Sequence, residues 1–204
     1  ITLDGFRVYL RPPHIRDWEE WIAMRERNRE ILIPLEPKWP DKALDKEFFM
    51  RRLSRQLRDW SHDRGYPFLL YLRDTDALIG GVNLNNVCRG AAQFASIGYW
   101  LDEKHQGMGY MSEGIRLIIY YAFGALKLHR INAGCLPHNE RSIKVLTRLG
   151  FVEEGFAKSY LEINGRWQDH ILFGLTAEDW KEKQKTNLEH PDHESASGHS
   201  VSFK

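Results

Sequence analysis

Two glycines, two residues apart, stand where the sequence predicts that a strand ends and a helix begins. The stretch Gln106-Gly107-Met108-Gly109-Tyr110-Met111 follows the predicted strand Phe94–Leu101 and precedes a predicted helix over 110–126. The first turn of a helix offers unpaired N–H groups and a partial positive charge, and glycine lets the backbone approach a ligand closely. The residue types and their spacing therefore predict a site for an anion such as a phosphate.

Two common nucleotide-binding patterns do not fit this loop. The dinucleotide fingerprint G-x-G-x-x-G needs glycine where Ser112 stands, and it needs an acidic residue about twenty positions further on, near Asn132. The phosphate loop G-x-x-x-x-G-K-[ST] matches the gap between Gly150 and Gly155, but Phe156 follows where lysine is required. Taken alone, the glycine turn is equally consistent with a plain connection between a strand and a helix.

A second polar cluster opens another predicted helix. Asn139 follows Pro137 and suits the N-cap of a helix over 139–149, which Gly150 would end as a C-cap. Ser142 lies one turn further along the same helix. The order of strand, glycine loop, helix, strand, Asn-led helix and Gly-Phe is more informative than either cluster alone.

The elements that position these clusters follow from hydrophobic periodicity. Strands are predicted at 6–11, 67–73, 78–86, 94–101, 130–136, 152–163 and 167–175, and helices at 17–28, 42–63, 110–126, 139–149 and 177–185. The proline-rich segment 31–40 is predicted to be a loop, and Asn164-Gly165 a hairpin turn. The order predicts an α/β fold, a mixed α+β sheet of about seven strands with helices on both faces.

Length and composition narrow the classes of protein. The 204 residues suit one domain over 1–185 and a polar tail over 186–204, which holds too few apolar residues to order itself. A net charge of +1 favours neither nucleic acid nor membrane as a partner, and the apolar runs are too short to span a bilayer. Cys88 and Cys135 form neither a metal-binding pair nor a disulfide framework, so we expect no metal and a cytoplasmic location.

The two polar clusters resemble the signature segments of the GNAT acetyltransferases. The glycine loop is similar to the family's Q/R-x-x-G-x-G/A pattern, whose amides hold the pyrophosphate of coenzyme A; Met111 departs from it at the last position. Residues 139–151 resemble the family's N-x-x-S-x-x-x-L-x-x-x-G-F segment, which runs along the pantetheine arm. The resemblance implies the GNAT fold with a mostly antiparallel sheet, and acetyl-CoA as cosubstrate. The residues that it implies for binding are Tyr99, Trp100, Leu101, Gln106, Gly107, Met108, Gly109, Tyr110, Met111, Asn139 and Ser142.

Within the family, the chain is similar from about Val8 to Trp180 to enzymes that acetylate the N-terminal alanine of the fifth protein of the small ribosomal subunit. The stretches 81–90, 128–139 and 155–170 carry this likeness. It implies an α-amine as acceptor, a ribosomal protein or pre-ribosome as partner, no sequence-specific binding of nucleic acid, no membrane, and a monomer or homodimer. Two alternatives stay open: acetylation of a small amine, an aminoacyl compound or an antibiotic, and a CoA-binding partner in ribosome assembly without turnover.

The resemblance also suggests catalytic roles for direct attack within a ternary complex. The backbone amide of Leu101 is a candidate donor to the thioester oxygen as it becomes an oxyanion. Many GNAT enzymes protonate the departing thiolate with a tyrosine where Leu146 stands, so Ser142 is the replacement candidate. Glu36, in a loop that lines the acceptor pocket in the family, is the first candidate for the general base, before Asp102 and Glu103.

Other reactive residue types are interpreted as structural. Cys135 is expected to be a small buried strand residue, which disfavours an acetyl-cysteine mechanism. Histidines at strand ends are expected to be structural as well, and these are His129, His138 and His170. Arg51, Arg55, Arg58 and His62 form a basic stripe on the predicted helix 42–63, either a solvated face or a surface that approaches ribosomal RNA.

Overall fold

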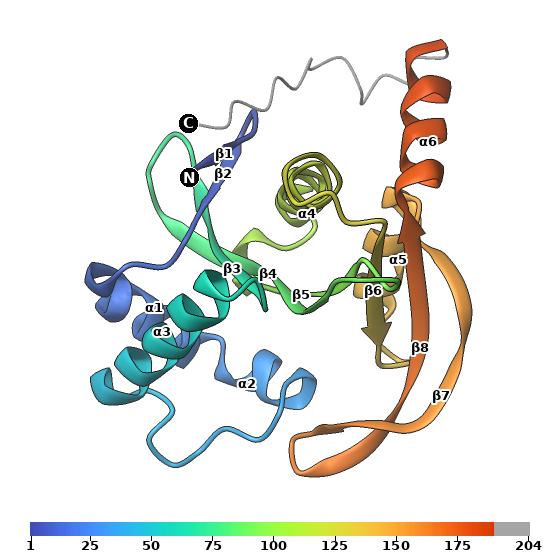
Figure 1. Ribbon diagram of the computed structural model, residues 1–204. Coiled ribbons are helices and arrows are strands. Elements are labelled where there is room, and N and C mark those ends of the chain that lie inside the picture. The colour runs from blue at the N-terminus through green and yellow to red at the C-terminus, as the bar shows by residue number, and fades with distance from the viewer. Residues whose placement is uncertain (190–204) are drawn as a thin grey trace.

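The apolar runs form one open sheet of eight strands in a computed structural model, which describes residues 1–189 (Figure 1). The strands are β1 (Leu3–Asp4), β2 (Val8–Arg11), β3 (Tyr66–Leu72), β4 (Leu78–Cys88), β5 (Phe94–Leu101), β6 (Arg130–Cys135), β7 (Val152–Ile163) and β8 (Arg166–Thr176). Their spatial order is β1-β2-β3-β4-β5-β6-β8-β7, and every neighbouring pair is antiparallel except β5 and β6. The predicted mixed, mostly antiparallel sheet is confirmed; the strand that sequence analysis missed is β1, whose two residues are too few to show alternation.

Helices cover both faces of this sheet, as expected. They are α1 (Trp18–Arg27), α2 (Arg29–Leu32), α3 (Lys46–Ser61), α4 (Tyr110–Tyr120), α5 (Glu140–Leu149) and α6 (Ala177–Glu189). Figure 1 shows α4 on one side of the central strands and α1, α2 and α3 on the other. Trp21 of α1 and Phe49 of α3 are buried in one apolar cluster, and Ile115 of α4 and Leu146 of α5 are buried in the second.

The side chains of β5 divide between these two clusters because successive residues of a strand point to opposite faces. Ile97 is buried on the face of α4 and α5, where Tyr99 and Leu101 pack against the same cluster. Trp100 is buried on the face of α1 and α3. Tyr99 and Leu101 of β5 therefore face α4 and α5, whereas Trp100 faces α1 and α3.

The two parallel strands separate partway along their length. β5 and β6 are paired at Phe94 to Ser96 and Arg130 to Asn132, and they diverge beyond that point. The N–H of Asp102 donates to the carbonyl oxygen of Ile79 on β4 at 2.8 Å. Because hydrogen-bonding directions alternate along a strand, the N–H groups of Tyr99 and Leu101 face away from β4, into the gap that β6 leaves.

The segment predicted to be a loop over 31–40 begins as helix, so that prediction is wrong for its first residues. Ile31 and Leu32 end α2, and a 3₁₀ turn follows at Ile33–Leu35. Pro34 is tolerated there because the first turn of a helix leaves its N–H groups unpaired in any case. The compact turn holds the following residue, Glu36, close to the sheet.

The C-terminal helix is longer than predicted. α6 continues past residue 185 to Glu189, and the remainder of the predicted polar tail, 190–204, lies outside the described residues. Among residues 1–189, no helix combines the length and the apolar character that crossing a bilayer requires.

Candidate functional site

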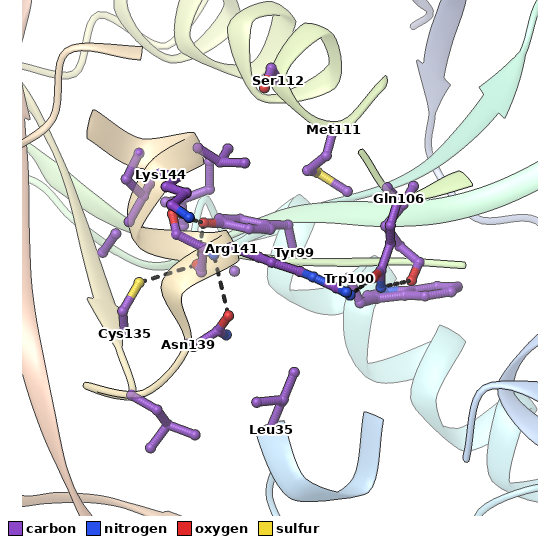
Figure 2. Close-up of a pocket in the computed structure, with 18 of the residues that line it drawn as sticks. Leu35, Tyr99, Trp100, Gln106, Met111, Ser112, Cys135, Asn139, Arg141 and Lys144 are labelled. Atoms are coloured by element: carbon purple, nitrogen blue, oxygen red, sulfur yellow. Dashed lines mark hydrogen bonds between the residues drawn. The ribbon is translucent and has the colours of Figure 1, made fainter. Parts of the chain in front are cut away.

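A cavity of about 670 Å³ opens where β5 and β6 separate (Figure 2). It is bounded by β5, β6, the glycine loop, α5 and the segment from Ile31 to Glu36. The residues predicted to bind the cosubstrate line this cavity, with the exception of Met108 and Tyr110. Glu36, the predicted base, lines it too. The structure thus brings together residues that lie more than a hundred positions apart in the sequence.

The glycine loop has the backbone conformation that its sequence predicted. Gly107 and Gly109 have φ angles of +75° and +81°, which side chains other than glycine's rarely adopt. Gly109 is the N-cap of α4, so the unpaired N–H groups of that helix begin at the cavity wall. Met108 points outward and is 53% exposed.

Arg7, on the turn before β2, holds the outer side of this loop. Its Nη1 donates to the carbonyl oxygen of Met108 at 2.9 Å, and its Nε donates to the buried carboxylate of Glu113 at 3.1 Å. The guanidinium also lies 4.9 Å from the ring centre of Tyr110. These contacts fix the loop from the far side and leave its inner side open to a ligand.

Gln106 connects the loop to the two walls of the cavity. Its Nε2 donates to the carbonyl oxygen of Leu101 at 3.4 Å, and its Oε1 accepts a hydrogen bond from Arg141 of α5. Lys144 and Arg148 line the cavity from the same helix. Sequence analysis missed this row of cations, although its spacing of three and four residues along one helix was visible. Together with the N-terminus of α4, the row makes this end of the cavity electropositive.

Asn139 and Ser142 are brought together as predicted. The Oδ1 of Asn139 accepts a hydrogen bond from the N–H of Ser142 at 3.2 Å, so Asn139 is the N-cap of α5. The Oγ of Ser142 lies 2.5 Å from the hydroxyl of Tyr99 and 3.1 Å from the Sγ of Cys135. Three groups that can hold or donate a proton therefore meet between β5, β6 and α5.

Burial controls the protonation of this cluster. It holds the pKa of the Tyr99 phenol well above its ordinary value, and it raises the pKa of the Cys135 thiol despite the opposing hydrogen bond from Ser142. Both groups are therefore protonated at neutral pH. A protonated thiol is a poor nucleophile. The cluster is suited to donating a proton, and it is not suited to forming an acetyl-cysteine.

Glu36 is tightly held in the wall of the cavity. Its Oε1 accepts a hydrogen bond from Arg25 at 2.8 Å, while its Oε2 accepts one from the same guanidinium and one from the indole of Trp39 at 2.8 Å. The guanidinium of Arg25 also lies 4.5 Å from the ring centre of Trp39. Both carboxylate oxygens of Glu36 thus already accept hydrogen bonds from the protein.

The tip of the β7–β8 hairpin touches the same segment. The N–H of Asn164 donates to the carbonyl oxygen of Glu36 at 2.8 Å. A Cβ built at Gly165 would lie 3.8 Å from the Cδ of Lys38. Residues from the first and the last parts of the described chain therefore share one border of the cavity.

Asp102, weighed as a base from its position after β5, has a different place. Its carboxylate is buried and accepts hydrogen bonds from Arg27 at 2.8 Å, from Asn28 at 2.8 Å and from His105 at 3.0 Å. Burial opposes its ionisation, but these hydrogen bonds outweigh burial and lower its pKa to about 2. This carboxylate anchors the loop before α4, and it does not line the cavity.

The comparisons with known proteins agree with this geometry. The sequence profile of the acetyltransferase (GNAT) domain matches residues 7–152. The chain is 38% identical over 173 residues to the probable N-acetyltransferase YjcK of Bacillus subtilis (strain 168), covering 85% of this chain and 96% of that protein. It is 38% identical over 182 residues to the ribosomal protein uS5-alanine N-acetyltransferase of Escherichia coli (strain K12), covering 88% and 93%. The structure of Mycobacterium smegmatis RimJ in complex with CoA-disulfide superposes with a TM-score of 0.83 at 32% identity, covering 94% of this chain and 90% of that one.

Proposed function

The chain belongs to the GNAT acetyltransferase family, and we propose that it acetylates the N-terminal α-amine of a ribosomal protein in the cytoplasm. It is an N-acetyltransferase, and its cosubstrate is acetyl-CoA. The proposed acceptor is the N-terminal alanine of the fifth protein of the small ribosomal subunit. The support for this acceptor is the 38% identity, over nearly the whole of both chains, to an enzyme named for an alanine of ribosomal protein uS5.

Residues of the cavity fit the parts of acetyl-CoA. We propose that the N–H groups of the glycine loop and of the first turn of α4 bind the pyrophosphate; this is supported by Gly107 and Gly109 lining the cavity at the start of that helix. Arg141, Lys144 and Arg148 supply further positive charge to the phosphates. Asn139 and Ser142 are the proposed contacts of the pantetheine arm, which is supported by both residues lining the same cavity as the glycine loop.

An N-terminal α-amine needs little help from a general base, because part of it is already deprotonated at neutral pH. Its pKa is about 7.7–8.0, against about 10.4 for lysine, so roughly a tenth of it is neutral at pH 7. The difference of about 2.5 units corresponds to about 3.5 kcal/mol of deprotonation cost. Positioning of the two substrates and stabilisation of the developing charge then supply most of the rate.

The reaction that we propose is direct attack of the amine on the thioester in a ternary complex. The new C–N bond forms as the C–S bond breaks, and the amine loses one proton while the thiolate gains one. The N–H of Leu101 donates to the thioester oxygen as negative charge develops on it. Ser142 donates the proton that the thiolate takes up, the phenol of Tyr99 replaces it, and the proton that the amine loses returns to the phenol through solvent. Glu36 as the general base stays a prediction.

One observation carries the proposal: β5 and β6 are unpaired beyond Ser96 and Asn132, and Tyr99 and Ser142 meet within the unpaired region. We propose that the N–H of Leu101 and the hydroxyl of Ser142, which contacts a protonated phenol, both face the thioester there. An oxyanion donor and a proton donor on two sides of one gap match the two charges that thioester aminolysis creates.

The test is acetyl-CoA turnover with a panel of amines. The panel holds a peptide that begins with the N-terminal alanine of the small-subunit protein, the same peptide with a blocked N-terminus and one internal lysine, and free polyamines. We expect acetylation of the free α-amine alone, identified by mass spectrometry of the product peptide. Acetylation of a polyamine alone would keep the chemistry and discard the ribosomal assignment, and binding of CoA without any turnover would favour a role in ribosome assembly.

A further inference from the structure

His170 of β8 lies on the face of the sheet opposite to α4 and α5, the helices whose residues are proposed to hold the cosubstrate, so this is the face left for the acceptor. On β8 the neighbouring Ile171 packs against the cluster under α4 and α5, so His170 points to the opposite face. A Cβ built at Gly134 of β6 would lie 3.6 Å from the Cδ2 of His170, which places both residues on that face. We call this surface, with Trp100, Gly134 and His170, the acceptor face.

On the acceptor face, the backbone next to His170 is not covered by side chains. Gly134 is exposed, whereas Ala133 and Cys135 on either side of it are buried. Gly98, on the facing part of β5, also has no side chain. Both glycines line the cavity, so the gap between the strands can be reached from the acceptor face beside His170.

The hydrogen bonding of His170 fixes which ring nitrogen is basic. Its Nδ1 lies 3.0 Å from the carbonyl oxygen of Gln168. A carbonyl oxygen only accepts, so Nδ1 carries the hydrogen and the lone pair of the neutral ring is on Nε2. Among residues 1–189, no protein group forms a hydrogen bond with Nε2. Nε2 is also not one of the fully buried side-chain atoms without a hydrogen-bond partner, so it keeps some exposure. The ring is 2% exposed and lines the cavity, so this small exposure includes Nε2.

The groups around the ring leave this nitrogen free to accept a proton. The ring of Tyr160 on β7 packs edge-on at 5.6 Å between centres. Cys135 of β6 points to the opposite face. Across the cavity, Glu36 is neutralised by Arg25. The cations of the cavity, Arg141, Lys144 and Arg148, belong to α5 on the side of the cosubstrate.

We propose that Nε2 of His170 is the group that accepts the proton from the acceptor amine, an inference that rests on the proposed acetyl transfer. The neutral amine forms its bond to the thioester carbon, and its nitrogen gives one proton to Nε2. The C–S bond breaks and the thiolate receives a proton from Ser142, and the proton of the imidazolium returns through solvent to the hydroxyls of Tyr99 and Ser142. His170, expected from the sequence to be structural, is in this assignment a catalytic residue. Glu36, with both oxygens engaged, supports the wall of the acceptor pocket.

Chemical rescue by imidazole distinguishes a catalytic role of His170 from a structural one. His170→Ala leaves a space next to the cavity that free imidazole can enter, and His170→Gln keeps the size of the side chain without its basicity. We expect both variants to bind CoA with an affinity within about threefold of the wild type, and to lose at least about tenfold in kcat. Added imidazole should restore turnover of His170→Ala in proportion to its concentration and leave the wild type unchanged. The matched control is His129→Gln, because His129 is exposed and far from the cavity lining.

Each outcome decides between the alternatives. Wild-type kcat in His170→Gln would overturn the assignment, and a large loss in Glu36→Gln alone would give the role of base to Glu36. Loss of CoA binding in His170→Ala, without rescue by imidazole, would make His170 a structural residue. If the wild type acetylates only small amines, the same measurements on that amine test His170 while the ribosomal acceptor is discarded. If it acetylates no amine, both proposals fail.

Discussion

At the scale of single residues, the site depends on a short chain of hydroxyl and thiol groups. Tyr99, Ser142 and Cys135 come from three elements and meet within 2.5 Å and 3.1 Å of one another. Leu146, the position at which the resemblance to the family implies a tyrosine, is fully buried and offers no proton. In the proposed mechanism the phenol of Tyr99, which contacts Ser142, supplies the proton instead.

Ser142→Ala should lower kcat by about tenfold, because a thiolate leaves fairly readily even without an acid. The Michaelis constant for acetyl-CoA should change little, since the loss concerns the transition state. Tyr99→Phe should lower kcat less, and the double variant should resemble Ser142→Ala, because both residues act through one proton. Steady-state kinetics of the three variants provide the measurement. Ser54→Ala, at an exposed position on α3, is the control, and an unchanged kcat in Ser142→Ala would remove Ser142 from the mechanism.

Leu101→Pro removes the N–H that faces the gap. We expect kcat to fall by about 100-fold or more, because the developing oxyanion loses a hydrogen-bond donor. This N–H points away from β4, so proline removes no hydrogen bond between β4 and β5. Thermal melting and CoA binding should therefore remain measurable in the variant. Turnover close to that of the wild type in a folded variant would show that another group binds the oxyanion.

Motifs in the sequence predicted that Gln106, Gly109, Asn139 and Ser142 bind the cosubstrate, and all four line one cavity. His170 was assigned a structural role because its proposed use depends on which face of β8 it occupies and on the pairing of β8 with β6. Those two facts come from long-range strand order, which a local pattern does not contain.

At the scale of elements, one buried carboxylate joins the end of α1 to the end of β5 and the loop before α4. Asp102 accepts from Arg27 and Asn28, and the Oδ1 of Asn28 in turn accepts from the N–H of Glu103 at 2.9 Å. α1 was predicted from its own apolar positions. Its attachment to the glycine loop was not predictable, because it depends on polar contacts between residues about 75 positions apart.

Asp102→Asn should destabilise the fold by about 2 kcal/mol at neutral pH, since the folded pKa is about 2 and the unfolded value is about 3.9. A depressed folded pKa contributes stability above the unfolded pKa, and that contribution is lost as pH falls from about 4 to about 2. Urea unfolding at pH 6 and pH 3 should show that the difference in the free energy of unfolding between wild type and variant becomes smaller at the lower pH. The control is Asp74→Asn, on an exposed turn. If the difference in the free energy of unfolding between wild type and Asp102→Asn stayed constant with pH, the lowered pKa of Asp102 would be contradicted.

At the scale of the whole molecule, the charge of +1 creates no general attraction to RNA, so any such attraction must be local. Arg51, Arg55 and Arg58 are exposed along α3, and Arg51 pairs only loosely with Glu47 at 3.6 Å. α3 packs on the acceptor face of the sheet (Figure 1). If the proposed ribosomal substrate binds at that face, the basic stripe is on the side where RNA around the substrate would lie, and this stays a prediction.

Replacing the three arginines by glutamine should weaken binding to a small ribosomal subunit and make the salt dependence of that binding shallower. Acetylation of a free peptide should not change, because the stripe is remote from the cavity lining. Filter binding or sedimentation at several salt concentrations measures the slope. A variant with Lys158, Lys181 and Lys185 changed to glutamine loses the same charge elsewhere, and an equal effect of the two variants would make the stripe an ordinary solvated face.

The mixed, mostly antiparallel character of the sheet was predictable from the order of strands and helices along the chain and from the hairpin signal at Asn164-Gly165. The spatial order of the strands was not predictable from such local patterns. The separation of β5 from β6 was not predictable either, because it depends on what fills the gap between two parallel strands and no periodicity in the sequence records that. The 3₁₀ turn after α2 was hidden by the proline at position 34, which suits a loop and the first turn of a helix equally well.

The junction at Asp102 has a kinetic consequence. The glycine loop and the segment from Ile31 to Glu36 are attached to the two ends of this junction, the first after Asp102 and the second after Asn28. A ligand that immobilises the loop therefore also steadies the wall of the acceptor pocket before an acceptor arrives. We expect acetyl-CoA to add first and CoA to depart last, so that CoA competes with acetyl-CoA and is noncompetitive toward the peptide in product-inhibition experiments.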